Sequence, residues 1–293
     1  MELLKNCPAC QSGSIKSFLK SRDYFLSNEE FLVEECNECG LRYTNPRPGF
    51  SEILKYYDSA DYISHDSSRK GVLTWIYTHA RNYMLNKKFN IVSAGSKGKR
   101  ILDIGCGTGE FLNFCKSRGF ESYGVELNEK PREAAIQEYG LDIRKSLNDY
   151  LLEDAKFDCI TLWHVLEHIH DLENTMHMVK HLLKPEGTLI IALPNSSSWD
   201  AVHYGQFWAA YDLPRHLYHF NKSSFAKFAG IHKLKIIKIL PQVLDSFYIS
   251  LLSEKYRTGK NNFLKAFLYG AMSNFHAWKQ GNAYSSLIYI LHA

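Results

Sequence analysis

The chain has 293 residues, of which 45% are hydrophobic and 14% aromatic, so it can bury one α/β core together with a small appended module. Its formal net charge is only +4 at pH 7, and no dense block of Lys and Arg stands out, so the composition does not favour a nucleic-acid partner. Because the sequence shows neither an export signal nor a run of about eighteen uncharged apolar residues, we expect a cytoplasmic protein without a membrane span.

The N-terminal module, residues 1–70, contains two C-x-x-C pairs: Cys7 with Cys10, and Cys36 with Cys39. Each pair places two thiolates in one tight turn, and four thiolates suit a tetrahedral Zn²⁺ that has no open position. We therefore predict a structural zinc ribbon whose metal serves folding alone. Paired disulfides are the alternative, and the reducing cytoplasm disfavours them.

An extended tether is predicted to leave this ribbon over residues 41–48, because a residue that precedes proline is pushed away from helix. The aromatic segment that follows could cap an active site, although surface tyrosines are an equally good interpretation; it contains Tyr56, Tyr57, Tyr62 and His65. Apolar residues at helical spacing then predict a bridging helix, which together with its linker covers residues 71–98.

The strongest pattern of the chain is residues 100–111, R-I-L-D-I-G-C-G-T-G-E-F. The apolar run predicts a buried strand, and three glycines at alternate positions predict a sharp turn whose backbone a ligand can approach. A second predicted strand ends at an acidic residue, Glu126, about 20 residues on. A glycine-rich turn without a ligand is the alternative.

From residue 99 onward, strands and helices alternate with short loops, which predicts a doubly wound α/β fold with a mainly parallel sheet. The last predicted strand, residues 285–291, is preceded by an insertion over residues 243–283. Wide apolar stripes predict that this insertion is helical. We interpret it as a lid or a substrate-pocket wall, with a dimer face or an in-plane membrane helix as the alternatives.

The D-x-G-x-G-x-G loop followed by Glu126 resembles motif I of the class I, Rossmann-like S-adenosylmethionine-dependent methyltransferases. The resemblance covers about residues 95–240 and implies a seven-stranded sheet whose last strand is antiparallel. It also implies that S-adenosylmethionine contacts the following residues: Asp103, Gly105, Gly107, Gly109, Glu126, Leu127 and Trp163.

Two further segments resemble parts of methyltransferases. Residues 157–168 are similar to the motif after the fourth strand of small-molecule methyltransferases, including those of the ubiquinone pathway, which faces the methyl group. Residues 212–220 resemble the P-R-H-L-x-H-F block of a large group of bacterial methyltransferases. The lack of an N-P-P-Y type motif lowers the case for a nucleic-acid substrate.

We predict that a histidine is the general base, because neutral imidazole can accept a hydroxyl proton at cytoplasmic pH. His216 is the first choice, His164 and His219 come next, and His168 completes the set. The competing interpretation is that His216 is structural and bonds a backbone carbonyl.

The pattern His164-x-x-Glu167-His168 also spells the H-x-x-E-H of the inverzincin peptidases, but a peptidase would carry it inside a long helix. A divalent cation held by these three side chains could polarise a substrate hydroxyl. A Glu167–His168 pair that only fixes the loop is the other interpretation.

Together these patterns predict a methyltransferase that acts at an oxygen of a small molecule or of a glycan or lipid precursor, with peripheral membrane contact left open. An RNA methyltransferase that uses the ribbon as a substrate module is one alternative. A non-catalytic protein that binds S-adenosylmethionine is the other. Neither the acceptor nor the oligomeric state follows from these residues.

Overall fold

The computed structural model describes residues 1–57, 72–279 and 281–292, with the backbone alone for 72–78. The chain forms two compact units. The first unit consists of Met1–Ser59, His164–Glu173 and Ala192–Tyr289, and the second unit consists of Ala60–Trp163, Asn174–Ile191 and Ile290–Ala293. The predicted domain limits at residues 70 and 98 stay predictions, and Tyr62 and His65 lie outside the described residues.

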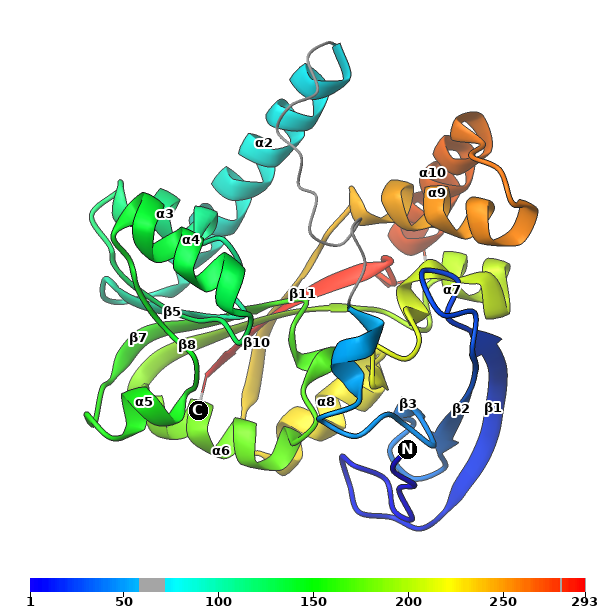
Figure 1. The fold of residues 1–293 in the computed structure, drawn as a ribbon, viewed down its shortest axis with the longest axis horizontal. Coiled ribbons are helices and arrows are strands. Elements are labelled where there is room, and N and C mark those ends of the chain that lie inside the picture. The colour runs from blue at the N-terminus through cyan, green and yellow to red at the C-terminus, as the bar shows by residue number, and fades with distance from the viewer. Residues whose placement is uncertain (58–71, 280, 293) are drawn as a thin grey trace. The chain divides into compact units, whose positions relative to one another are not determined.

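A seven-stranded sheet has the strand order β10-β11-β8-β7-β4-β5-β6 (Figure 1). Its strands are β4 (Arg100–Ile104), β5 (Glu121–Val125), β6 (Asp142–Arg144), β7 (Phe157–Trp163), β8 (Leu183–Pro194), β10 (Lys235–Pro241) and β11 (Ser286–His292). The pairs β4–β5, β4–β7 and β5–β6 are parallel, and the last strand is antiparallel. The predicted fold class is therefore confirmed.

In the second unit, helices cover both faces of the parallel strands, with α3 and α4 on one face and α5 and α6 on the other (Figure 1). The helices are α2 (Val72–Gly95), α3 (Glu110–Lys116), α4 (Glu129–Tyr139), α5 (Asn148–Leu151) and α6 (Leu172–Leu182). Since both faces are covered, the four residues of β4 after Arg100 are all buried, which explains the apolar run in the sequence.

A smaller antiparallel sheet in the first unit has the order β1-β2-β3-β9. Its strands are β1 (Ile15–Arg22), β2 (Glu30–Cys36), β3 (Arg42–Thr44) and β9 (Tyr218–His219). The pairing of Tyr43 with Tyr218 joins the predicted tether to the P-R-H-L-x-H-F block. The cysteine module is therefore completed by a strand from far along the chain, which the sequence analysis did not foresee.

The first unit also contains four short 3₁₀ turns and four α-helices among its described residues. The short 3₁₀ turns are η1 (Ile53–Tyr56), η2 (Leu166–His168), η3 (Gly205–Phe207) and η4 (Ala209–Tyr211), and the helices are α7 (Trp199–Tyr204), α8 (Lys222–Ile231), α9 (Asp245–Thr258) and α10 (Phe263–Lys279). The predicted helical insertion is thus the pair α9 and α10. None of the described helices combines the length and the apolarity that crossing a bilayer requires.

Candidate active site

The glycine loop after β4 has a backbone that side chains would penalise. Gly105, Gly107 and Gly109 have φ angles of +71°, +55° and +74°, in the left-handed region. A Cβ on Gly109 would lie 2.8 Å from side-chain atoms of Ala135 and Leu141, whereas a Cβ on Gly107 would meet nothing within 4 Å. Gly109 therefore allows close packing, and Gly107 leaves the backbone open to a ligand.

Glu126 is tied directly to this loop. Its Oε2 accepts a hydrogen bond of 2.9 Å from the Gly107 N–H, and its Oε1 accepts one of 2.8 Å from the Asn128 N–H. A carboxylate offers about four lone-pair sites, so this side chain keeps acceptor capacity for two hydroxyls. Leu127, the next residue, is exposed. The predicted acid and the predicted loop thus lie at the same strand ends.

Asp103 is buried within β4, and its Oδ1 accepts a hydrogen bond of 2.6 Å from the Thr161 hydroxyl of β7. Burial raises the pKa of Asp103 to about 7, although the Thr161 hydrogen bond opposes that shift. Trp163 packs edge-on against Phe111, with 5.7 Å between ring centroids. The roles predicted for Asp103 and Trp163 toward a cofactor stay predictions.

The first unit holds a second polar group, which we call the histidine–carboxylate cluster: Glu167, His168 and His216. Their ligand atoms all lie within 4.8 Å of one another. Glu167 is fully buried, and among the described residues neither of its carboxylate oxygens accepts a hydrogen bond. Its Oε1 has a charge partner, because the Nδ1 of His164 lies 3.4 Å away, and a buried carboxylate without such a partner would be costly.

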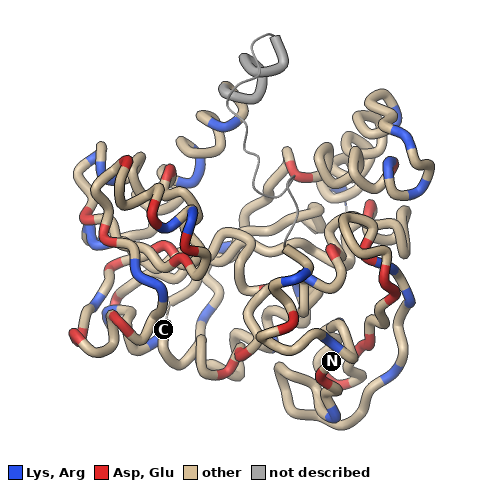
Figure 2. The backbone as a smooth tube through the Cα atoms, in the orientation of Figure 1, with Lys and Arg blue, Asp and Glu red and all other residues tan. Residues whose placement is uncertain are grey.

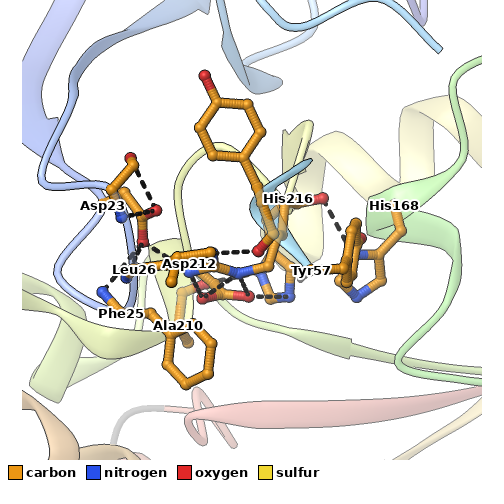
Figure 3. A network of polar contacts seen from close by, with 11 residues as sticks. Asp23, Phe25, Leu26, Tyr57, His168, Ala210, Asp212 and His216 are labelled. Atoms are coloured by element: carbon orange, nitrogen blue, oxygen red, sulfur yellow. Dashed lines mark hydrogen bonds and ion pairs between the residues drawn. The ribbon is translucent and has the colours of Figure 1, made fainter. Parts of the chain in front are cut away.

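Both histidines of the cluster are oriented by backbone carbonyls, as Figure 3 shows. The Nδ1 of His216 lies 2.9 Å from the Ala210 carbonyl oxygen, and the Nδ1 of His168 lies 3.0 Å from that of Arg215. A carbonyl only accepts, so each Nδ1 carries the proton and each Nε2 keeps a lone pair. Burial, together with the neighbouring His216, lowers the pKa of His168 to about 4, so His168 is neutral at pH 7.

The other two predicted histidines have different surroundings. The Nε2 of His164 lies 2.7 Å from the Gln242 amide nitrogen and 3.4 Å from Asp245 Oδ2. Burial lowers its pKa, but Asp245 and Glu167 outweigh burial and raise the pKa to about 9. His219 is buried in β9, and burial lowers its pKa well below the ordinary value.

A buried ion-pair network holds the loop that carries His216. The Arg215 guanidinium donates a hydrogen bond of 2.9 Å to Asp23 and one of 2.7 Å to Asp212, two carboxylates that are labelled in Figure 3. It also donates a hydrogen bond of 2.9 Å to the Tyr56 carbonyl. Asp23 and Arg215 are almost fully buried, although 192 residues separate them. Sequence analysis missed both residues, because no local pattern links positions so far apart.

The four cysteines of the ribbon come together as predicted. Cys7 Sγ lies 3.5 Å from Cys39 Sγ, Cys10 Sγ lies 3.5 Å from Cys36 Sγ, and no cysteine forms a disulfide. Four thiolates at Zn–S distances of about 2.3 Å would be separated by about 3.8 Å. A hydrogen bond from Cys7 lowers the pKa of Cys39 to about 5, which favours a thiolate there. The residues present therefore fit a tetrahedral zinc ion.

Comparisons with known proteins identify the family to which the chain belongs. A family model described as "Methyltransferase domain" matches residues 77–235. The ubiquinone biosynthesis O-methyltransferase of Azoarcus sp. (strain BH72) is 32% identical over 108 residues, which cover 34% of this chain and 46% of the relative. The same-named protein of Pasteurella multocida is 29% identical over 146 residues, which cover 44% of this chain and 60% of the relative. The chain thus spans about half the length of these relatives.

A solved structure of a SAM-dependent methyltransferase from Archaeoglobus fulgidus is also similar. It has a TM-score of 0.49 and 20% sequence identity, over 73% of this chain and 94% of that chain.

Proposed function

Because the chain belongs to the methyltransferase-domain family, we propose that it transfers a methyl group from S-adenosylmethionine to an oxygen of a small molecule. The observation that carries this proposal is the hydrogen bond from the Gly107 N–H to Glu126, which joins an open backbone turn to a hydroxyl-binding carboxylate. The relatives named as ubiquinone biosynthesis O-methyltransferases support the small-molecule acceptor and the oxygen nucleophile.

The second unit binds the donor in this proposal. Glu126 accepts hydrogen bonds from the two ribose hydroxyls, and Gly105 and Gly107 lie under the amino-acid end, where no side chain obstructs the backbone. The bound donor supplies an electrophilic methyl group that a nucleophile displaces from sulfur in line. The protein must therefore align the acceptor, exclude water and remove the hydroxyl proton.

His216 removes that proton in this proposal. Its Nδ1–H is held by the Ala210 carbonyl, so its Nε2 is the atom that accepts the proton as the C–O bond forms. The carboxylate of Asp212 lies 4.0 Å from Nε2 and stabilises the positive charge that the ring acquires. His164 is a weaker candidate, because its Nε2 is already engaged by the Gln242 amide at 2.7 Å and its Nδ1 faces Glu167.

The test of the reaction class follows label from methyl-labelled donor into fractionated cell extract. We expect label in the small-molecule or lipid-soluble fraction. Label confined to RNA would overturn the proposal in favour of an RNA methyltransferase, and label in no fraction would favour a non-catalytic binding protein.

The test of the base uses His216→Asn once the labelled acceptor is purified. Loss of a general base lowers kcat about 100-fold while leaving the donor Kd unchanged. His170→Asn is the matched control, because its ring bonds the Pro48 carbonyl and lies outside the cluster. Normal turnover in His216→Asn, or a loss of activity explained by a lower Tm, would contradict this role.

A second candidate role for the cluster is a divalent cation site, which the mutual proximity of its ligand atoms, all within 4.8 Å of one another, favours. The carboxylate and the two Nε2 atoms are ligands that Mn²⁺, Fe²⁺ and Zn²⁺ accept, and the carbonyls behind each Nδ1 orient them as ligands. The proximity of His216 to Glu167 and His168 supports including it in this set, and the predicted His164 also lies near, with its Nδ1 3.4 Å from Glu167 Oε1. A bound cation would polarise an acceptor hydroxyl.

The two roles of His216 exclude each other, since a coordinated Nε2 cannot accept a proton. Calorimetric titration with Mn²⁺ separates them, because oxygen and nitrogen ligands bind this ion and the thiolates of the ribbon prefer zinc. Binding that disappears in Glu167→Gln would favour the cation. No heat of binding, with activity retained in a mild chelator, would favour the base.

We also infer a structural zinc ion at Cys7, Cys10, Cys36 and Cys39, supported by the mutual proximity of their sulfur atoms. Four thiolates leave no open coordination position, so the ion serves folding and takes no part in the reaction.

A further inference from the structure

Helix α10 presents its large apolar side chains to solvent. The outward residues, which we call the apolar stripe, are between 42% and 71% exposed: Phe263, Leu264, Phe267, Leu268, Met272, Phe275 and Trp278. A helix on the surface of a globular protein normally turns such residues toward the core and its polar residues outward. This helix does the reverse, and a contiguous apolar patch of this kind marks an interaction surface.

The rotation of α10 is fixed by the opposite face, which carries small residues. Ala266, Gly270, Ser273 and Ala277 are the buried positions of the helix. A Cβ on Gly270 would lie 2.7 Å from the ring of Phe247, so the two helices approach each other as closely as glycine allows. The helix therefore cannot roll its large apolar side chains inward without losing this packing.

Two polar contacts, one buried and one partly buried, hold the same orientation. The Ser273 hydroxyl donates to Asp200 at 2.8 Å, and the Asn274 amide donates to the Val243 carbonyl at 2.9 Å. A rotated helix would lose both hydrogen bonds, and polar groups that lose their partners in the interior cost free energy. The packing and the hydrogen bonds of α10 therefore fix the apolar stripe on its outward face.

The surroundings of the stripe are strongly basic. Residues 255–293 contain Lys255, Arg257, Lys260, Lys265 and Lys279 and no Asp or Glu, although Arg257 pairs with the buried Glu254 that precedes this segment. The whole chain has 35 basic and 31 acidic residues, so residues 1–254 hold 30 basic and 31 acidic ones. The net positive charge of the protein therefore comes from this last segment, and Figure 2 shows Lys and Arg, without Asp or Glu, along α10 and the turn before it.

We propose that α9 and α10 dock on an anionic phospholipid bilayer, with α10 in the plane of the interface and the apolar stripe among the acyl chains. Aromatic and aliphatic side chains flanked by lysines are what this interface takes up. A second copy of the chain would bring two positively charged faces together, which charge repulsion disfavours. Nucleic acid would match the lysines but not the exposed aliphatic stripe. The inference concerns where the protein resides and does not depend on the proposed reaction.

The test is co-sedimentation of the full chain with vesicles. Phosphatidylglycerol mixed with phosphatidylcholine is compared with phosphatidylcholine alone. We expect at least about tenfold tighter binding to the anionic vesicles, because each basic residue near the surface adds electrostatic attraction, and we expect that preference to fall at high salt. The double variant Phe267→Ser with Trp278→Ser should lose at least about tenfold in affinity while the chain stays folded at the assay temperature, which a Tm measurement checks because the Phe267 ring stacks on Phe247. Leu152→Ser is the matched control, since Leu152 is also highly exposed but belongs to the second unit.

A charge variant, Lys260→Glu with Lys265→Glu, should abolish the preference for anionic vesicles while leaving the apolar stripe intact. The proposal is overturned if the protein does not sediment with vesicles of either composition. It is also overturned if sedimentation velocity shows a dimer that the Phe267→Ser and Trp278→Ser variant dissociates, because the stripe would then be the interface between two copies.

Discussion

The glycine loop of the second unit and the histidine–carboxylate cluster of the first unit are built in opposite ways. The loop is a backbone site: Gly107 leaves open space where a side chain would stand, and Glu126, which accepts its N–H, follows 19 residues later. The cluster consists of side chains from residues 167–168 and 216. The loop that carries His216 is held by the ion pair between Arg215 and Asp23, which are 192 residues apart. A local site of the first kind tolerates change elsewhere in the chain, whereas a site of the second kind depends on long-range packing. This difference predicts which changes damage each site.

Removal of the zinc ligands should produce the largest effect. The variant Cys36→Ser, or treatment with a strong chelator, should unfold the ribbon, which has too little apolar core to fold without a metal. The pairing of β3 with β9 would then be lost, and with it the support of the loop that carries His216. We expect methyl transfer to disappear while the donor Kd in the second unit stays within about twofold, a change smaller than one lost hydrogen bond would cause.

Elemental analysis and calorimetry check this prediction. The wild-type chain should contain one zinc ion per molecule, and Cys159→Ser, a buried cysteine of the second unit, serves as the control with zinc retained. Absence of zinc, or a folded ribbon in Cys36→Ser, would disprove the structural role of the metal.

Breaking the buried ion pair should come next in size. Asp23→Ala leaves the buried guanidinium of Arg215 with one carboxylate fewer, and loss of one partner of a buried pair costs about 3–5 kcal/mol of unfolding free energy. Urea unfolding measures this loss. Glu30→Ala, which removes an exposed carboxylate from β2, is the control and should change little. Equal effects of the two substitutions would show that Asp23 does not support the loop.

The same ion pair predicts a pH dependence. Burial raises the pKa of Asp23, but Arg215 and the neighbouring donors outweigh burial and hold the pKa below its ordinary value of 3.8. A carboxyl whose pKa is lowered by folding stabilises the protein above that ordinary pKa and loses this contribution as the pH falls through the folded value. The stability gap between wild type and Asp23→Ala should therefore be constant at neutral pH and shrink below about pH 4. A gap that stays unchanged down to the acid transition would contradict the ion pair.

A smaller effect is expected at the donor site. Glu126→Ala leaves the two ribose hydroxyls without their acceptor, which should cost about 1–3 kcal/mol of donor binding. Calorimetry with S-adenosylmethionine measures it, and Glu129→Ala, which removes an exposed carboxylate three residues later, is the control. An unchanged donor affinity in Glu126→Ala would remove this residue from the site.

The smallest effect is expected for the side-chain contacts that join β3 to the segment before and within β9 in the first unit. The Thr44 hydroxyl of β3 donates to the His216 carbonyl at 2.9 Å. Thr44→Val keeps the shape of the side chain and removes that bond together with the 3.2 Å contact to His219 Nε2, so stability should fall by about 1–2 kcal/mol. We expect a correspondingly modest fall in kcat with no change in the donor Kd. A loss of donor binding would show that the two sites are coupled more strongly than their construction suggests.

Sequence reasoning succeeded where a function depends on consecutive residues. The strand–turn–helix around Gly105 to Gly109, the alternation of strands and helices, and the four-cysteine module all follow from local spacing and local backbone preference. The fold and the family were therefore predictable, and both are confirmed. The roles assigned to individual cofactor and histidine residues stay predictions.

The same reasoning could not find Asp23 or Arg215 as partners, or place His216 beside Glu167. Those contacts depend on which loop packs against which strand, and one sequence alone contains no periodicity that reports such a pairing. It did single out residues 212–220 through the P-R-H-L-x-H-F block, which contains Asp212, Arg215 and His216 but gives no sign of their partners.

The pairing of β3 with β9 also constrains how the protein is made. When the ribosome has released the first 60 or so residues, as it does within seconds, the ribbon can already capture its metal. Its β3 edge must nevertheless wait for a partner, because 175 residues separate Thr44 from His219. An unpaired strand edge is a template for pairing with other chains. Slow or stalled translation between these segments should therefore promote aggregation of nascent chains, and chaperone demand should concentrate in that interval.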